Sequence, residues 1–314
     1  MSVIGRLLDK KSRLTKNPKI GDLPRRLWQS SLNALHSIGL YRLPGEPVYR
    51  RFDEDLTVCL LPGEFLTKRV WFHGYVQYDE EYFLREYVSP GMVIIDAGAN
   101  IGTRSLICGK RVRPGGMVHA FEPMRQTYAL LRRNVARNEL GDVIRVNRMA
   151  VLDRTGQMVR FIQEPRHSDM ARVDVRDGSV LQGEDGLMSD EVQSVALDGY
   201  VESNDIQRLD LVKLDIEGSE SKAFSGCRRM LLRFRPTVIC EFNGPLLRRM
   251  GSCPRDLWEA FKGLGYGFYT YNARARFFTL KGVCCSEESV ETYIGTVDIE
   301  HLAKRIGASI HGRD

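Results

Sequence analysis

Hydrophobic and polar residues follow one another along the middle of the chain in blocks that predict strands and helices in turn. Three consecutive apolar residues, Val93-Ile94-Ile95, are typical of a buried strand, and Asp96 stands where that strand should end. In chain order, the pattern then predicts a helix from Thr103, a strand at 117–121, a helix from about Met124 and a strand at 143–146. This β-α-β-α-β alternation predicts an α/β fold with a mostly parallel, doubly wound sheet.

The second half of the chain continues this pattern and adds to it. Two added strands are predicted at 158–162 and 192–197, and two further core strands at 211–214 and 236–240. A helix at 254–264 and a terminal hairpin-like strand pair at 268–271 and 277–280 follow. A polar stretch at 164–190 separates the two added strands and is too long for an ordinary connection, so we expect a mobile loop near the site or a partly disordered segment.

The chain divides into four expected parts. A basic amphipathic N-terminal arm (1–47) precedes an accessory segment (48–87) with strand-like runs and a tyrosine-rich helix. The main domain spans 88–282, and a C-terminal tail spans 283–314. The helices of the arm are expected to cover the core or a partner subunit, and peripheral contact with an anionic membrane is the alternative. The sequence predicts no oligomeric state.

Charge and composition limit the classes of function. The net charge of the 314 residues is +6, and residues 1–30 carry eight basic and two acidic residues, so the remainder is balanced. A balanced core does not have the basic surface of a nucleic-acid-binding protein. Seven scattered cysteines without metal-ligand spacing, and no secretory or membrane-spanning segment, predict a cytoplasmic protein.

The turn after the first core strand indicates the class of ligand. Its order is Asp96-x-Gly98-x-x-x-Gly102, whereas a dinucleotide fingerprint is G-x-G-x-x-G with a pyrophosphate on the helix N-terminus. A carboxylate before the turn repels a pyrophosphate and suits a cation. S-adenosylmethionine (SAM) carries an ammonium and a sulfonium group, so the turn favours SAM over NAD. A tight turn without a ligand is the remaining alternative.

Acidic residues recur at the predicted strand ends, at Asp96, Glu122, Asp215 and Glu241. The carboxyl ends of parallel strands share one edge of a sheet, and ligands bind in the crevice outside that edge. An acid at the end of the second strand, here Glu122, accepts hydrogen bonds from the ribose hydroxyls of an adenosine, in SAM and NAD alike.

Methyl transfer from a sulfonium needs an aligned nucleophile and a group that takes its proton. The candidates are Asp215, Glu217 and Glu241, with Asp215 expected to be the most sensitive position; His73 and His167 come after them. No metal ligands are assigned. The alternative is that Asp215, with Glu241 or Asn243, holds Mg²⁺, which prefers oxygen ligands.

Four stretches, VIIDAGANIGTRSL, AFEP, LVKLDIEGSESKAFSG and VICEFN, resemble the FkbM family of SAM-dependent methyltransferases over roughly residues 88–282. The most specific element is Asp215-Ile216-Glu217-Gly218-Ser219-Glu220, which follows a strand that contains Lys213. The resemblance implies a class I methyltransferase (Rossmann-like) fold and O-methylation of a hydroxyl on a sugar, glycan or natural product. The chain departs from the family where members often have a glutamate before the preceding helix, since it has Gln77 and Asp79 there.

The resemblance also implies roles for individual residues. Asp96, Gly98 and Gly102, with Ala97 and Asn100 between them, would bind the methionine end of SAM. Glu122 would hold the ribose and Ala150 with its neighbours would flank the adenine, while Asp215 and Glu217 would face the methyl group and the acceptor. The alternatives to this reading are an NAD-dependent oxidoreductase and a non-catalytic SAM-fold binding module.

Overall fold

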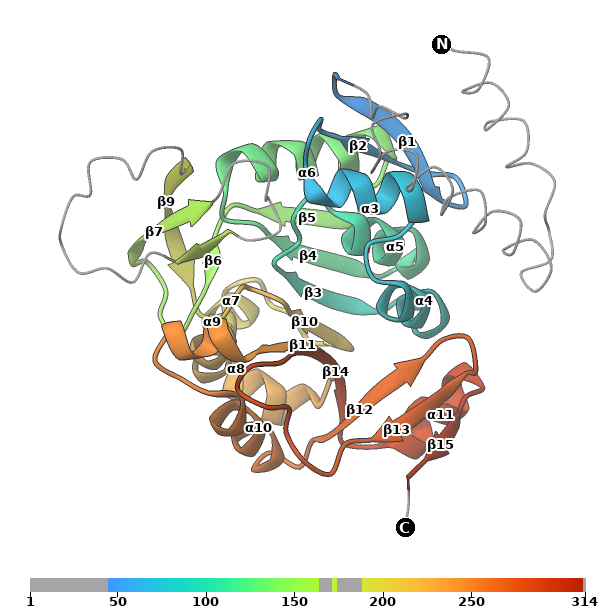
Figure 1. Ribbon diagram of the computed structural model, residues 1–314, viewed down its shortest axis with the longest axis vertical. Helices are drawn as coiled ribbons and strands as arrows, with labels where there is room; N and C mark the ends of the chain where they lie inside the picture. Colours follow the sequence, from blue (N-terminus) through green and yellow to red (C-terminus); the bar gives the residue numbers. More distant parts are fainter. Residues whose placement is uncertain (1–44, 164–170, 174–187, 313–314) are drawn as a thin grey trace.

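The structure is a computed structural model, and it describes residues 45–163, 171–173 and 188–312 (Figure 1). Nearly all of the predicted basic arm and most of the predicted loop at 164–190 lie outside the described residues. Among the described residues, no helix is long and apolar enough to cross a membrane.

A nine-stranded sheet forms the centre of the molecule. From one edge to the other its strands are β15 (Ser309–His311), β13 (Phe277–Leu280), β12 (Gly267–Asn272), β14 (Val290–Thr296), β11 (Thr237–Asn243), β10 (Leu211–Leu214), β3 (Val93–Ala97), β4 (Met117–Phe121) and β5 (Ile144–Asn147). The five strands from β11 to β5 are parallel, and β14 is antiparallel to both of its neighbours. The predicted α/β fold, its mostly parallel sheet and the β12–β13 hairpin are confirmed.

The strand order reverses between β3 and β10. The chain builds β3, β4 and β5 towards one edge and then returns to place β10 on the other side of β3. In register, Asp96 of β3 pairs with Lys213 of β10. Such a reversal leaves a crevice at the carboxyl ends of the two strands, because the following loops diverge to opposite faces. The glycine turn after β3 and Asp215 after β10 border this crevice.

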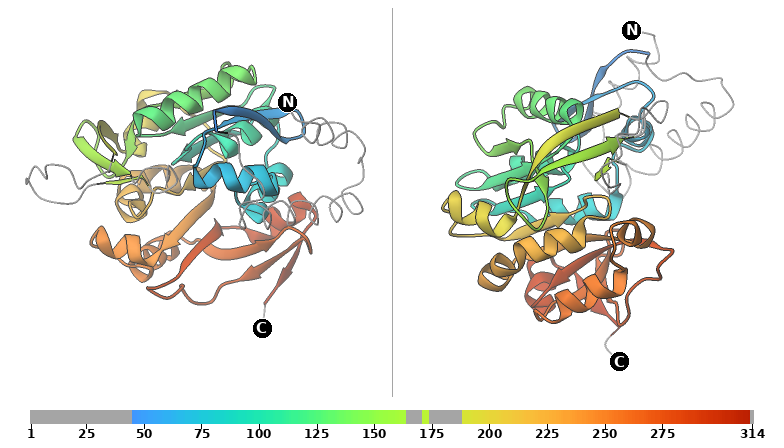
Figure 2. Two further views of the ribbon diagram at one scale, coloured as in Figure 1. Left: turned by 45° about the horizontal axis from the view of Figure 1, so that its top comes forward. Right: turned by 90° about the vertical axis from the view of Figure 1, so that its left-hand side faces the viewer.

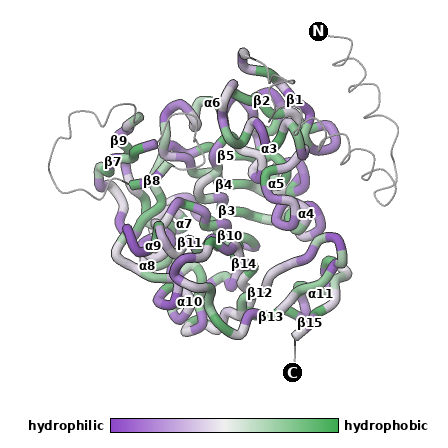
Figure 3. The backbone as a smooth tube through the Cα atoms, viewed as in Figure 1, coloured by the Kyte–Doolittle hydropathy of each residue, from purple (hydrophilic) through white to green (hydrophobic). Residues whose placement is uncertain are grey.

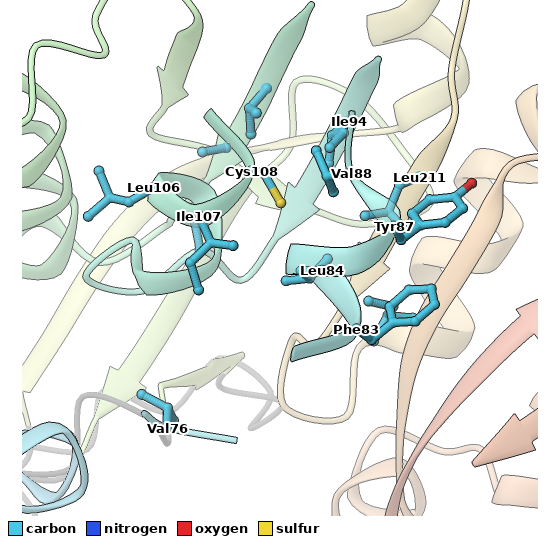
Figure 4. Packing of buried hydrophobic residues seen from close by; sticks show 14 of the residues in the cluster. Val76, Phe83, Leu84, Tyr87, Val88, Ile94, Leu106, Ile107, Cys108 and Leu211 are labelled. Atoms are coloured by element: carbon cyan, nitrogen blue, oxygen red, sulfur yellow. The ribbon is translucent and has the colours of Figure 1, made fainter. Parts of the chain in front are cut away.

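Helices cover both faces of the sheet. They are α3 (Phe65–His73), α4 (Tyr78–Tyr87), α5 (Thr103–Val112), α6 (Arg125–Arg137), α7 (Leu197–Ser203), α8 (Glu220–Phe234), α9 (Gly244–Arg249), α10 (Pro254–Lys262) and α11 (Ile299–Ile306). Neighbouring residues of β3 point to opposite faces. Ile94 packs with Leu84 and Ile107 of α4 and α5 (Figure 4), and Ile95 belongs to the core formed with α7, α8 and α10. Hydrophobic residues accordingly gather along the central strands (Figure 3).

Two smaller sheets flank the main one. β1 (Val48–Asp53) and β2 (Leu56–Leu60) form an antiparallel pair, and β6 (Ala150–Val151), β7 (Met158–Gln163), β8 (Arg172–Val173) and β9 (Met188–Val195) form a four-stranded sheet. The four-stranded sheet lies beside the carboxyl ends of the main strands (Figures 1 and 2). This places β6 and β7 next to the crevice.

Three local predictions were wrong. Residues 65–73 form a helix within a stretch predicted to be strand-like, because Leu66 and Val70 are buried at a spacing of four residues. The added strand predicted at 192–197 stops at Val195, and α7 begins two residues later. β11 does not end before Glu241 but continues past it to Asn243, paired with β14.

The last thirty residues contribute to the main sheet. The segment expected as a C-terminal tail (283–314) carries β14, α11 and β15, and β14 lies between β11 and β12. Its loop also packs on α9, since a Cβ atom at Gly244 would overlap the backbone of Glu287. The C-terminal segment therefore supports one wall of the crevice.

Candidate active site

A cavity of about 410 Å³ opens at the carboxyl ends of β3, β4, β10 and β11. Its volume is within the range typical of small-molecule sites. Among the residues predicted to form the site, those that line it are Gly98, Asn100, Glu122, Asp215, Glu217 and Glu241. The structure therefore brings together most of the residues that the sequence predicted, although they lie up to 143 positions apart in the chain.

The glycine turn has a backbone that other residues rarely adopt. Gly98 has φ +80°, Asn100 φ +50° and Gly102 φ +95°, all in the left-handed region. A Cβ atom at Gly98 would overlap the carbonyl oxygen of Asp215. The absence of a side chain at Gly98 is what lets the two loops meet at the crevice.

Glu122 follows β4 and faces the cavity. Its Oε2 accepts a hydrogen bond from the backbone N–H of Asn100 (3.0 Å), and its Oε1 accepts one from that of Met124 (3.0 Å). Burial raises the pKa of Glu122 to about 7 despite these two bonds. Each carboxylate oxygen keeps one further lone pair for a ligand donor such as a ribose hydroxyl.

Lys213 is a buried cation beneath the cavity floor. Its Nζ lies 3.2 Å from Oδ2 of Asp215 and 3.5 Å from Oδ1 of Asp96, and it donates to the carbonyl of Gly98 (3.4 Å). Burial alone would raise the pKa of Asp215, but the charges of Lys213 and Arg104 outweigh it and lower that pKa. Asp215 is therefore held as a carboxylate.

Asp96 lies one layer behind the cavity rather than on its surface. It is buried within β3, where its Oδ2 accepts a hydrogen bond from Oγ of Ser105 (2.5 Å). Asp96 does not line the cavity but supports it, through its ion pair with Lys213 and through the glycine turn that follows Asp96 in the chain.

Three carboxylates converge at one end of the cavity. Asp215, Glu217 and Glu241 each place an oxygen within 4.8 Å of the others. Glu241 is 8% exposed, and its Oε2 has no hydrogen-bond partner. Burial, followed by repulsion from Asp215 and Glu220, raises its pKa well above the usual range. The pair Asp215 and Glu241 thus combines a carboxylate held ionised with one that binds a proton readily.

The same three oxygens could hold a divalent cation, since Mg²⁺ prefers carboxylate ligands. Lys213 already compensates the charge of Asp215 from 3.2 Å, which reduces the attraction of the cluster for a second cation. Proton transfer and metal binding both remain chemically available to these groups.

Other predicted residues do not line the cavity. Ala150 is 1% exposed and packs in a small core with Met124 and Phe161, whereas its neighbour Val151 faces the cavity. Ala97 is buried at the end of β3, and Gly102 packs against Leu131, so both belong to the turn without lining the cavity. His73 at the end of α3 does not line the cavity, and His167 lies outside the described residues.

Several lining residues were not predicted as site residues. Thr103 and Arg104 come from the first turn of α5, Arg69 comes from α3, and Gln77, noted only as a departure from the family, precedes α4. The sequence around Arg104 does not identify it as a site residue, because its partner Glu80 lies on another helix and the pair therefore forms no short motif. The remaining walls are largely apolar and contain Phe65, Leu66, Val76, Val151, Phe161, Ile216 and Leu246.

The class I SAM-dependent methyltransferases share four features with this structure. These are a parallel sheet with this reversal of strand order, an antiparallel strand inserted near one edge, a glycine turn after the first core strand and an acid after the second. Residues 96–268 match the family described as the methyltransferase FkbM domain, and the chain belongs to this family. The predicted family is therefore confirmed.

Individual relatives are more distant. The chain is 28% identical over 172 residues to 31-O-demethyl-FK506 methyltransferase FkbM of Streptomyces tacrolimicus, a match that covers 48% of this chain and 65% of the relative. It is 28% identical over 155 residues to methyltransferase sdnD of Sordaria araneosa, covering 42% and 59%. The chain thus spans about three fifths of the length of these relatives.

The fold is also similar to that of methyltransferase FkbM from Methylobacillus flagellatus KT. The two structures have a TM-score of 0.40 and 14% sequence identity, over 93% of this chain and 58% of the other.

Proposed function

We propose that this protein transfers the methyl group of SAM to a hydroxyl oxygen of a small-molecule acceptor such as a sugar, glycan or natural product. The observation that carries the proposal is the convergence of Asp215, Glu217 and Glu241 at a cavity that also contains the glycine turn and Glu122. One relative, at 28% identity, is named as the methyltransferase of 31-O-demethyl-FK506, an oxygen acceptor.

The charge of the site favours SAM over NAD. The cations in and around the cavity are Lys213, Arg104 and Arg69, and they are outnumbered by the acids Glu80, Asp96, Asp215 and Glu217, without counting Glu241. SAM has a net positive charge when its amine is protonated, whereas NAD would bring a pyrophosphate to a crevice bordered by acids. The family assignment likewise favours the methyltransferase prediction over the oxidoreductase and binding-module alternatives.

The residues divide the work of the reaction. SAM, when bound, supplies an electrophilic methyl group on its sulfonium. Glu122 accepts hydrogen bonds from the ribose, and Gly98 lets the backbone approach the ligand closely. The apolar residues Phe161 and Leu246 help to exclude water, so the acceptor oxygen rather than water is the nucleophile.

A carboxylate then removes the proton of the acceptor. As the acceptor oxygen bonds to the methyl carbon, the carbon–sulfur bond breaks with its electron pair on sulfur, and the hydroxyl proton passes to the carboxylate. Glu241 lines the cavity and, once ionised, is the stronger base of the two, so we assign it this role. Asp215, paired with Lys213, is a weaker base.

The test is methyl transfer from isotopically labelled SAM to a library of hydroxylated acceptors, with products identified by a mass increase of one CH₂. Labelled O-methyl products that disappear with Glu241→Gln support the proposal. SAM binding without any transfer would favour the binding module, and transfer only to nitrogen or carbon would exclude the hydroxyl acceptor.

A further inference from the structure

A buried ion pair lies at the end of the cavity nearest the glycine turn. Nε of Arg104 donates to Oε1 of Glu80 (3.2 Å), and its Nη2 donates to Oε2 (3.3 Å). Arg104 is on the first turn of α5 and Glu80 on the first turn of α4, so both helix starts meet here (Figure 1). Arg104 is 8% exposed, and that remaining surface lines the cavity.

The pair leaves donors of Arg104 free. A guanidinium has five N–H groups in one plane, and Glu80 takes two of them on one edge. The opposite edge is directed away from Glu80, and a planar ligand with two acceptor oxygens is what such an edge binds best.

The position of Arg104 identifies the part of the ligand that it would meet. Arg104 follows Gly102 of the glycine turn by two residues, and the charges that act on it include those of Asp215, Asp96 and Lys213. Arg104 therefore lies at the methionine end of the bound cofactor, where the only anionic group of SAM is its carboxylate.

We propose that Arg104 binds the methionine carboxylate of SAM and that Glu80 holds the guanidinium in the orientation required. This inference rests on the proposed use of SAM. It gives Arg104 a binding role and Glu80 a positioning role.

Arg69 is the other cation that lines this cavity, and it is the competing candidate. Its Nη1 donates to the carbonyl of Val76 (2.7 Å), and its guanidinium lies 5.4 Å from the ring of Phe65 at the mouth. Arg69 lies on α3 and not on the helix that follows the glycine turn, so its position fits an acceptor group better than the cofactor.

The experiment compares SAM with decarboxylated SAM, which lacks the carboxylate and keeps the ammonium, sulfonium and adenosine. Dissociation constants are measured by calorimetry for the wild type, Arg104→Met, Arg69→Met and Arg132→Met. Arg132 lies on the exposed face of α6 beside Tyr128 and is the matched control. The double variant Glu80→Gln with Arg104→Met avoids leaving a buried carboxylate without its partner.

We expect Arg104→Met, alone or with Glu80→Gln, to weaken SAM about ten- to hundredfold and decarboxylated SAM less than about threefold. Retained binding of decarboxylated SAM shows that the variant is folded. Equal losses for both ligands, or a selective loss in Arg69→Met instead, would overturn the inference. Failure of the wild type to bind SAM would instead refute the proposed function.

Glu80→Gln alone separates positioning from packing. A neutral amide can still pack against Arg104 but no longer fixes its charge, so we expect a selective loss for SAM of about three- to tenfold. A variant that binds both ligands as the wild type does would remove the positioning role from Glu80.

Discussion

The backbone carbonyl oxygen of Asp215 occupies the space that a side chain would need at Gly98. This contact joins the loop after β3 to the loop after β10, the two strands at which the strand order reverses. It brings the cofactor turn and the acid cluster next to each other in the lining of one cavity.

Gly98→Ala tests this contact directly. The new methyl group would overlap Asp215, and the residue also has φ +80°, so we expect a large loss of stability and of SAM binding. Gly91→Ala is the matched control, because Gly91 has φ +79° but nothing within 4 Å of the added atom. Thermal unfolding should show a cost of about 1 kcal/mol at Gly91, from backbone strain alone, and several kcal/mol more at Gly98. Similar costs at both positions would mean that the two loops are not in close contact.

The acid cluster is tested by single-turnover methyl transfer once an acceptor is known. We expect Glu241→Gln to lower the rate by about 10²–10⁴-fold with little change in SAM affinity, because a base acts in the transition state. Asp215→Asn should have a smaller effect, and Glu217→Gln the smallest. Strand position alone made Asp215 the first candidate; its ion pair with Lys213 is what moves the expectation to Glu241.

A metal-dependent mechanism gives a different result in the same assay. Treatment with EDTA would then abolish transfer in the wild type, and added Mg²⁺ would restore it. Because Lys213 already compensates Asp215, we expect EDTA to leave the rate unchanged.

The pKa of Glu122 predicts how SAM binding varies with pH. Below a pKa of about 7 the group is protonated in the free protein, and a protonated carboxyl has fewer acceptors for the ribose. SAM should therefore bind about tenfold more weakly at pH 6 than at pH 8. Glu122→Gln removes the titration, so its affinity should be lower at pH 8 and should lack this part of the dependence. A wild type and a Glu122→Gln variant with the same pH profile would contradict the role of Glu122.

Glu220 predicts a pH-dependent stability. It is fully buried at the start of α8, accepts a hydrogen bond from the N–H of Ile216 (2.9 Å), and burial raises its pKa to about 7. Between its usual value of 4.5 and 7, the folded state binds a proton that the unfolded state has lost, so stability falls as pH rises through this window. Glu220→Gln should raise the free energy of unfolding at pH 8 by at most about 3 kcal/mol, and with it the melting temperature. Near pH 4 the substitution should have little effect. The exposed Glu259→Gln is the control, and an equal effect at both pH values would refute the assignment.

The sequence was most informative where chemistry and backbone geometry coincide. Asp96 and Gly98 could be predicted because a glycine turn directly after a buried strand has few other uses, and Glu122 and Asp215 followed from the rule that parallel strands share an edge. All but Asp96 line the cavity. His119, in the middle of β4, is packed in the core instead, with its Nδ1 3.0 Å from the hydroxyl of Tyr200.

What could not be predicted depends on contacts between distant segments. The Glu80–Arg104 pair joins two helices, and nothing in either helix alone marks its polar residue as buried. Ala150 and its neighbours were predicted to flank the adenine, and the alternation of side chains along a strand, which decides that Val151 is the one that faces the cavity, depends on the strand pairing. The insertion of β14 between β11 and β12 required strand pairing across some fifty residues, which no local pattern reveals.

The central claim, that this cavity binds SAM, is tested most directly by calorimetric titration of the full chain with SAM and, separately, with NAD. The account predicts saturable 1:1 binding of SAM, weakened about tenfold or more by Glu122→Ala through loss of a charge-assisted hydrogen bond, and no binding of NAD. Binding of NAD, or the absence of SAM binding by the folded wild type, would contradict it.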